Sequence, residues 1–573
     1  MSKACRGHSM AGLPRNMKSR FPQKQERQPT RSADNPEQRL DMKYLITAIT
    51  GIIALISQSL ATEIDSDNRR VSLAYINDVH AQLDPHPELF WSGRKEDYVR
   101  NAGGLSRIAT VFKELRKQRP GEMLFLDGGD TIQGSGPAAW TEGKVVVDPM
   151  NSLGLDIAIP GNWAVTYGAD AWKQRAGEFN YKMIAANMSD DAGKQLFDPY
   201  VIKEINGVRL GIIGFTEPDI PVRQPPFMSD GLKFQESEVL QPLVDELRNR
   251  EKVDVVVVVS HIGLPRAVGL AESLKGVDII LSADTHERTY EPLVRGDTWI
   301  VEAGAFASFV GLLDITVSPE NKIIDRSWRL IELRPELFPE DPEVKQIVET
   351  ALAPHRERMN QVIGHTSVWL ARYQVLNTSI DNVVADAIRQ STGADIALSN
   401  GYRFAPPTAP GAITEADLWT WLPINLELKT GMASGEQMRK YWENELQNVF
   451  SRNPDELFGG WLPRISGLTV EFNRNAEPDK RLRNLIVDDK PIDPEKMYSL
   501  AAGHRPGAPE DNVHRVAGCR LIRKSEITTH DAVRNHLKTN SPISSEGDPN
   551  VRCIDCPGII RSQYLQEIGE KAP

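Results

Sequence analysis

From residue 71 to about residue 318, short apolar runs rich in Val and Ile alternate with polar or amphipathic segments. Runs that are apolar at almost every position are typical of strands buried on both faces. Between them, Leu105–Arg116 and Val239–Arg250 have the apolar spacing of helices with one buried face. This alternation predicts an α/β domain whose sheet is covered by helices. The expected strands are Val71–Ile76, Met123–Leu126, Ile157–Ile159, Met183–Ala185, Val208–Ile213, Val253–Val259, Val277–Leu281 and Trp299–Val301.

The pattern changes near residue 340, which predicts a second domain. A chain of 573 residues is too long for one ordinary core. Pro339 and Pro342 precede a charged helical stretch, and the segment beyond it mixes helical patterns with strand patterns, as in a smaller α+β domain. The expected divisions are 62–340 for the first domain, 341–361 for a helical connector, 362–540 for the second domain and 541–573 for a tail with little periodicity.

One apolar run near the N-terminus predicts export. From Met42 the chain reads MKYLITAITGIIALISQSLA, a basic start, an apolar stretch and small residues where a signal peptidase cleaves. The apolar part is shorter than the ~20 residues that span a bilayer. Residues 42–61 are therefore expected to be a signal peptide, and 1–41 an extension from a start codon placed too early. The mature protein is expected in the periplasm or outside the cell, without a stable membrane span.

The distribution of charge argues against nucleic acid as a partner. Residues 1–41 carry nine Lys and Arg against four Asp and Glu, so the remainder is more acidic than the net charge of −11 indicates. Phosphate backbones are bound by basic surfaces. The expected partner is instead a small anionic substrate or, from the resemblance described below, a sulfonated cysteine of a carrier protein.

Three cysteines, Cys519, Cys553 and Cys556, follow the N-terminal extension and the expected signal peptide. Cys553 and Cys556 form a Cys-x-x-Cys pair that could be redox-active, bind a metal or supply a partner for Cys519. Three thiols cannot all pair within one chain. We therefore expect one structural disulfide and one spare thiol.

Five polar motifs carry the functional prediction, because each directly follows one of the expected strands. Carboxyl ends of strands are where α/β folds assemble their sites. One such motif alone is more often structural than catalytic, whereas five in order are difficult to explain as scattered surface residues. The motifs are Asn77-Asp78-Val79-His80, Gly128-Gly129-Asp130-Thr131, Gly161-Asn162-Trp163, Ser260-His261 and Asp284-Thr285-His286.

These residue types suit a pair of divalent metal ions. Asp78 and His80, two apart on an extended stretch, can share one ion, and the carboxylate of Asp130 can bridge two. With His261 and His286 they make a mixed nitrogen and oxygen site, which favours Mn, Fe, Zn or Ni over Mg or Ca. Two such ions activate a water molecule and neutralise an anionic substrate. The sequence therefore predicts a two-metal hydrolase.

The ordered motifs resemble the calcineurin-like metallophosphoesterase superfamily, and the two-domain arrangement resembles its 5′-nucleotidase family. The resemblance covers about residues 70–530 and includes Ala397-Leu398-Ser399-Asn400-Gly401-Tyr402-Arg403. It implies a β-sandwich flanked by helices, followed by a smaller α+β domain that supplies the substrate pocket. It implies that Arg403 holds the anionic group, with Asn400 and Phe404 as further pocket residues. The implied metal ligands are Asp78, His80, Asp130, Asn162, His261, Asp284 and His286.

The sequence departs from the family pattern at three places. Trp163-Ala164 stands where the family has His-Glu, and the missing His helps the departing oxygen to leave. Asp284 replaces one imidazole, which adds negative charge. The aromatic segment that stacks a nucleobase is not recognisable in residues 500–507. We assign Asp130, Asn162 and Trp163 to catalysis, although Trp163 could equally pack beneath the metal loops.

A Trp at position 163 resembles the SoxB-type thiosulfohydrolase branch of the family. The segments Thr166-Tyr167-Gly168 and Asp130–Ser135 also look like that branch. That branch generally has His at the position of Asn162 and keeps the imidazole that Asp284 replaces here. The resemblance implies water attack on a sulfur-linked sulfonate. The alternatives are a 5′-nucleotidase or general phosphoesterase and, if the substitutions reflect decay, a non-catalytic exported binding protein.

Overall fold

Two six-stranded sheets form the centre of the first domain of the computed structural model. The structure describes residues 67–92, 95–399, 405–453, 456–457, 461–547 and 549–556. The first sheet has the order β16 (Ile323–Glu332), β15 (Phe309–Val317), β1 (Arg69–Ile76), β4 (Met123–Asp127), β5 (Ile157–Ala158) and β6 (Lys182–Met183). The second has the order β13 (Leu293–Arg295), β14 (Thr298–Glu302), β12 (Ile279–Ser282), β11 (Val255–His261), β9 (Val208–Thr216) and β8 (Tyr200–Ile205).

Parallel pairing brings the carboxyl ends of the central strands to one edge of each sheet. In the first sheet β1, β4, β5 and β6 run parallel, and in the second β9, β11, β12 and β14 do. Each of the apolar runs predicted as strands overlaps one of these eight. The mixed α/β class and the β-sandwich flanked by helices are thus confirmed.

The valine-rich strand β11 shows why the central strands are apolar at every position. Its Val255, Val257 and Val259 face the other sheet and pack with Val71 and Leu73 of β1. Val256 and Val258 point the opposite way, toward the helices. Because successive side chains of a strand alternate between faces, a strand covered on both sides needs apolar residues throughout.

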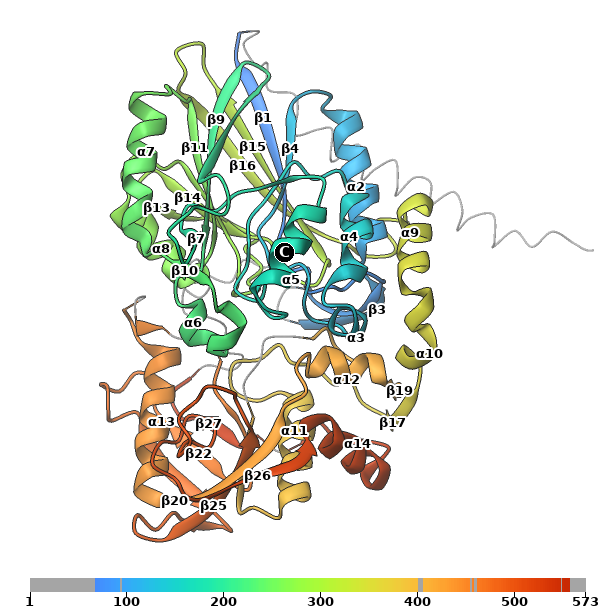
Figure 1. Ribbon diagram of the computed structural model, residues 1–573, viewed down its shortest axis with the longest axis vertical. Helices are drawn as coiled ribbons and strands as arrows, with labels where there is room; N and C mark the ends of the chain where they lie inside the picture. Colours follow the sequence, from blue (N-terminus) through green and yellow to red (C-terminus); the bar gives the residue numbers. More distant parts are fainter. Residues whose placement is uncertain are drawn as a thin grey trace, which may run out of the picture. The chain divides into compact units, whose positions relative to one another are not determined.

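Helices cover the outer faces of both sheets, as Figure 1 shows. On the side of the second sheet, α7 (Leu240–Asn249) and α8 (Leu264–Ser273) bury their leucines against β11 and β9. On the first sheet, α2 (Leu105–Gln118), α4 (Lys144–Asn151) and α5 (Ala169–Glu178) enclose a separate apolar cluster. Each sheet is therefore half of a helix–sheet–sheet–helix arrangement whose middle layer is apolar.

The second domain is α+β, as expected. Its main sheet has the order β21 (Arg464–Ser466), β18 (Ile396–Ser399), β25 (Met497–Gly503), β20 (Glu427–Ser434) and β26 (Arg520–Thr528). Its helices are α11 (Ser379–Thr392), α12 (Glu415–Trp421), α13 (Gly435–Phe450) and α14 (Thr529–Asn540). The chain enters it through α9 (Pro342–Leu352) and α10 (Arg356–Met359). The described residues, from Asp67 onward, belong to one compact unit.

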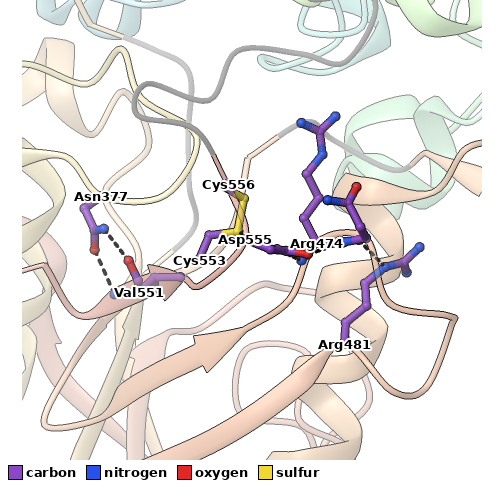
Figure 2. Close-up of a disulfide and its surroundings, with 8 residues drawn as sticks. Asn377, Arg474, Arg481, Val551, Cys553, Asp555 and Cys556 are labelled. Carbon is purple, nitrogen blue, oxygen red and sulfur yellow. Dashed lines mark hydrogen bonds between the residues drawn. A yellow bond between two sulfur atoms is a disulfide. The ribbon is translucent and has the colours of Figure 1, made fainter.

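Part of the predicted tail pairs with this second domain. Strand β27 (Val551–Cys553) runs parallel to β22 (Thr469–Phe472), and the backbone of Val551 is hydrogen-bonded to the Asn377 side chain at 2.7 and 3.0 Å (Figure 2). Cys553 and Cys556 form a disulfide beside it, and Asp555 accepts a 2.7 Å hydrogen bond from the Arg474 backbone N–H. Buried Cys519 is the spare thiol, so the expectation of one disulfide is confirmed.

The predicted signal peptide, 42–61, and the extension 1–41 lie outside the described residues. Within the part of the chain that the structure describes, no helix is both long enough and apolar enough to cross a bilayer. Because residues 42–61 lie outside the described part of the chain, cleavage of a signal peptide there stays a prediction.

Candidate active site

Loops at the carboxyl ends of β1, β4, β5, β11 and β12 bring the seven predicted metal ligands together. Each is buried, with at most 6% of its surface exposed. Loop contacts fix the arrangement: the Asp78 N–H donates to Gly129 O, and the His80 N–H donates to Asp130 O, both at 2.9 Å. The strand-end rule thus places the polar side chains as expected. These seven residues form the metal-ligand cluster: Asp78, His80, Asp130, Asn162, His261, Asp284 and His286.

One half of the cluster is made by Asp78, His80 and His286. The Nε2 atoms of the two imidazoles are 3.0 Å apart. Asp78 Oδ1 lies 3.3 Å from His286 Nε2 and 3.7 Å from His80 Nε2. These three side chains are spaced to hold a metal ion. Imidazole nitrogen and carboxylate oxygen together suit a transition-metal ion or zinc.

The other half is made by Asp130 and His261, with Asp78 shared between the halves. Asp130 Oδ2 lies 3.1 Å from His261 Nε2, and Asp78 Oδ1 lies 3.8 Å from it. These three groups form a second candidate metal cluster. Asn162, from the loop after β5, is buried beside them, and its Oδ1 makes no hydrogen bond.

The outer nitrogens of two imidazoles are held by backbone carbonyls. His80 Nδ1 lies 3.1 Å from Gln133 O, and His261 Nδ1 lies 2.7 Å from Gly128 O. With Nδ1 carrying the proton toward a carbonyl, Nε2 presents a lone pair to the cluster, which is the usual arrangement behind a metal-binding histidine. Asp78 Oδ1 and His261 Nε2 are buried and make no hydrogen bond. This donor set fits divalent cations.

The backbone at the cluster is strained, which is common where a side chain must be aimed for function. Five of the seven residues have a left-handed φ: Asp78 51°, His80 48°, Asp130 54°, Asp284 87° and His286 58°. Gly161 shows how closely the loops approach, because a Cβ there would lie 2.1 Å from Asp130 Oδ1. Only glycine is therefore compatible with Asp130 in this position.

The charges of the cluster act on one another strongly. Burial alone would raise the pKa of Asp78, but His286 and His261 bring it well below the ordinary value. Burial alone would lower the pKa of His261, but Asp130 and Asp78 raise it well above the ordinary value. The buried carboxylates of Asp78 and Asp130 thus favour a positive charge at His261, and the same negative charge would favour a bound cation.

Asp284 differs in its contacts from the other predicted ligands. Its Oδ1 accepts a 2.6 Å hydrogen bond from Asn162 Nδ2, and its Oδ2 accepts a 3.2 Å hydrogen bond from Arg223 Nη1. It belongs to neither of the two candidate metal clusters. Its role as a ligand stays a prediction.

A cavity adjoins the cluster and is lined by both domains. Trp163 and Arg223 line it from the first domain, and Ser399, Ile424 and Arg505 from the second. Trp163 is half-buried, and its backbone N–H donates a 2.8 Å hydrogen bond to Asp130 Oδ1. Asn400, Arg403 and Phe404 lie outside the described residues, so their assignment to the pocket stays a prediction.

Arg223 and its partner Glu217 are not among the site residues that the sequence predicts. Glu217 follows the last residue of β9, Thr216, so the strand-end rule that identified the other motifs applies to it as well. The apolar run predicts a strand that ends at Ile213, whereas β9 continues to Thr216, so Glu217 does not directly follow the predicted strand.

Comparisons with known proteins agree with this architecture. Residues 71–288 match the family model of the calcineurin-like phosphoesterases, and residues 362–503 match that of the 5′-nucleotidase C-terminal domain. Protein 5NUC of Lutzomyia longipalpis is 26% identical over 88% of this chain and 96% of its own length. The 5′-nucleotidase of Bos taurus is 24% identical over 73% of this chain and 78% of its own length.

Two solved structures from Thermus thermophilus share the fold. Sulfate thiohydrolase SoxB superposes with a TM-score of 0.77 at 24% identity, covering 87% of this chain and 99% of its own. A 5′-nucleotidase precursor superposes with a TM-score of 0.73 at 23% identity, covering 85% of this chain and all of its own. With both family models matched in order on the two observed domains, the chain belongs to the 5′-nucleotidase family of the calcineurin-like superfamily and is a metal-dependent hydrolase.

Proposed function

We propose that this hydrolase cleaves a sulfur-linked sulfonate with water and releases sulfate. The observation that carries the proposal is Trp163, which lines the cavity beside the metal-ligand cluster where a group that protonates a leaving oxygen would be needed. Indole carries no proton that it can transfer at neutral pH. A substrate whose leaving group needs no proton suits this site best.

The choice of leaving group follows from acidity. An alkoxide is a strong base, so its departure without a general acid costs about 10²- to 10⁴-fold in rate. A thiolate or persulfide is a much weaker base and departs unprotonated. In the proposed reaction the water oxygen bonds to the sulfonate sulfur, the sulfur–sulfur bond breaks, and its electron pair leaves on the thiolate. The water protons pass to sulfate and to solvent.

His514 is the other candidate acid at the cavity, and its surroundings make it a poor one. Burial and then Arg515 lower its pKa well below the ordinary value, so the imidazole is neutral. Its Nδ1 lies 3.0 Å from the Tyr441 hydroxyl. A neutral imidazole engaged in this way does not replace the missing acid beside Asn162.

The chain's own residues supply positioning and charge. Asp78, His80, Asp130, Asn162, His261 and His286 would hold divalent metal ions, and Asp284 remains a candidate ligand. When bound, such ions lower the pKa of a water molecule and neutralise an anionic substrate. The number and identity of the ions (Mn, Zn, Fe or Ni) are part of the proposal.

The second candidate function is a 5′-nucleotidase or general phosphoesterase. Relatives named 5′-nucleotidases favour it, as do the ligands that survive in the two candidate metal clusters, Asp78, His80, Asp130, His261 and His286. Against it, Gly503, Arg505 and Pro506 line the cavity in the segment where the family's base-stacking aromatics are expected. The surviving ligand set and the family match give no support to a non-catalytic binding protein.

Export belongs to the same proposal and rests on the signal-peptide pattern of residues 42–61. In the periplasm or outside the cell, the substrate would be a small sulfonated anion or the sulfonated cysteine of a carrier protein. A short peptide with S-sulfocysteine represents both, because it carries the reactive bond with little additional recognition surface.

The test is a comparison of two substrates on the metal-reconstituted protein. Sulfate release from an S-sulfocysteine peptide should exceed phosphate release from AMP by at least about 10²-fold in kcat/KM. Asp130→Asn protein is the blank for both reactions. Rapid cleavage of AMP with no sulfate release would overturn the proposal and establish the nucleotidase alternative.

A further inference from the structure

Arg223 lies where the metal-ligand cluster meets the cavity. It is the last residue of α6 (Ile220–Arg223), the short helix that follows β9. Its side chain is 16% exposed and lines the cavity together with Trp163 and Arg505. It therefore reaches both the cluster and the space that a substrate would occupy.

Carboxylates on two sides fix the guanidinium. Arg223 Nη1 donates to Glu217 Oε2 at 2.5 Å and to Asp284 Oδ2 at 3.2 Å. Glu217 is fully buried, and its other oxygen accepts a 2.6 Å hydrogen bond from Arg266 Nη1. Long side chains lose rotamer entropy when they are bound, and the two carboxylates that Arg223 contacts have already removed that freedom from it.

The charge of Arg223 is secure. A guanidinium stays protonated in proteins, and the carboxylates of Glu217 and Asp284 lie beside it at 2.5 and 3.2 Å. A guanidinium presents a planar set of N–H donors that matches tetrahedral oxyanions such as sulfate and phosphate.

Asp284 explains how the site accommodates this cation. A histidine at this position, as in the family pattern, would bring no negative charge toward Arg223. The carboxylate pairs with Arg223 on one oxygen and orients the Asn162 amide on the other, at 2.6 Å. The replacement of imidazole by Asp284 and the presence of Arg223 are thus two parts of one arrangement.

We propose that Arg223 is a substrate-binding residue whose guanidinium, held by Asp284 and Glu217, contacts the anionic sulfonate or phosphate group next to the metal cluster. In this arrangement Asp284 is a positioning residue. The inference rests on the proposed function only in requiring an oxyanion substrate, and it holds for a sulfonate or a phosphate.

Arg266 offers a matched control. It binds the same Glu217 carboxylate and also Asp219, at 2.5 Å, but it does not line the cavity. If Arg223 only stabilises the loop after β9, removing either arginine should change the anion affinity to a similar extent. If Arg223 binds the substrate, only its removal should weaken anion binding.

The experiment measures sulfate and phosphate affinity of the metal-reconstituted protein by titration calorimetry, with metal content by elemental analysis. Arg223→Gln should weaken binding of one or both anions by about 10- to 100-fold, because hydrogen bonds to charged groups have this magnitude. Metal content should stay unchanged. Arg223→Lys should recover part of the affinity, and Arg266→Gln should leave it within about 2-fold of the parent.

Three results would overturn the inference: unchanged anion affinity in Arg223→Gln, an equal loss in Arg266→Gln, or a loss of metal that accounts for the weaker binding. Thermal unfolding checks the fold of each variant. If Arg223→Gln does not fold, Arg223→Lys carries the test, since it keeps the charge and loses the planar donor set. Because affinity is measured without turnover, failure of this inference is distinct from failure of sulfate release.

Discussion

The Nε2 atoms of His80 and His286 face each other across 3.0 Å, with Asp78 Oδ1 3.3 Å from the second. Two buried imidazole nitrogens that converge beside a carboxylate are typical ligands of a divalent cation. Since no metal can be bound this way in the unfolded chain, metal binding should stabilise the fold as well as permit catalysis.

Removal of metal is therefore expected to lower both activity and stability. After treatment with a chelator, hydrolysis should fall by at least about 10³-fold. The free energy of unfolding should fall by about 4 kcal/mol relative to protein at 1,000 times the metal Kd. Titration with Mn, Zn, Fe or Ni should restore both. Thermal unfolding and a hydrolysis assay on the same samples measure the effects; full activity in metal-free protein would contradict the assignment.

Asp130→Asn should abolish turnover and keep the fold. The carboxylate lies 3.1 Å from His261 Nε2, and an amide in its place removes the negative charge that holds a cation. The Asn side-chain oxygen can still accept the Trp163 N–H hydrogen bond, which Asp130 Oδ1 accepts at 2.8 Å. We expect kcat/KM to fall by at least about 10³-fold with an unchanged circular dichroism spectrum. Asp148→Asn, on an exposed position of α4, is the control. Retained activity in Asp130→Asn would refute its role.

Trp163→His should shift the substrate preference. An imidazole beside Asn162 can protonate a leaving alkoxide, so AMP hydrolysis should rise by about 10²-fold, at the low end of general-acid effects. Trp163→Phe keeps an aromatic side chain without an acid, and it should leave AMP hydrolysis low. Steady-state kinetics on AMP and on the S-sulfocysteine peptide measure the shift. Equal behaviour of the two variants would mean that Trp163 only packs beneath the metal loops.

His530 should make the fold sensitive to acid. Burial lowers its pKa to about 4, and its Nε2 lies 2.7 Å from Leu422 O in the second domain. Between pH 4 and the unfolded value near 6.5, the unfolded chain binds a proton that the folded chain excludes. Stability from this residue is therefore complete above about pH 6.5 and is lost as the pH falls toward 4, by about 3 kcal/mol.

Chemical denaturation at several pH values tests this dependence. His530→Gln should lose less stability than the parent between pH 6.5 and pH 4, because it has no imidazole to protonate. His365→Gln, on an exposed histidine, should follow the parent curve. If the stability of the parent and of His530→Gln fell in parallel with pH, this histidine would not be the source of the acid sensitivity.

The sequence predicts the eight parallel strands of the two central sheets, because strands covered on both sides are apolar at almost every position. Val255–Val259 of β11 can be recognised without knowledge of its neighbours, since every position is apolar. Strands β3 (Lys95–Ala102) and β16 are not predicted, because they are rich in charged residues and all but one residue in each is exposed or half-buried. Their strand character depends on partners, β2 (His86–Ser92) and β15, that local pattern does not reveal.

The candidate site was predictable to the extent that its residues follow strands. Asp78 and Asp130 follow β1 and β4, which pair in parallel, and His261 is the last residue of β11 in the other sheet, which packs against the first. The pairing of Asp284 with Arg223 was not predictable in the same way. The two residues are 61 positions apart and meet only because β9 and β12 flank β11 in one sheet. A contact of that kind depends on strand order, which the sequence alone does not specify.

Anomalous diffraction from metal-loaded crystals, recorded at the absorption edge of the bound ion, tests the metal cluster most directly. The predicted result is a peak about 2.0–2.2 Å from the ligand atoms of Asp78, His80 and His286, with a second position beside Asp130, Asn162 and His261. Cys553, Asp555 and Cys556 are also close enough to bind an ion, but the disulfide occupies both sulfurs, so no peak is expected there. Absence of density between Asp78, His80 and His286 in catalytically active crystals would contradict the account.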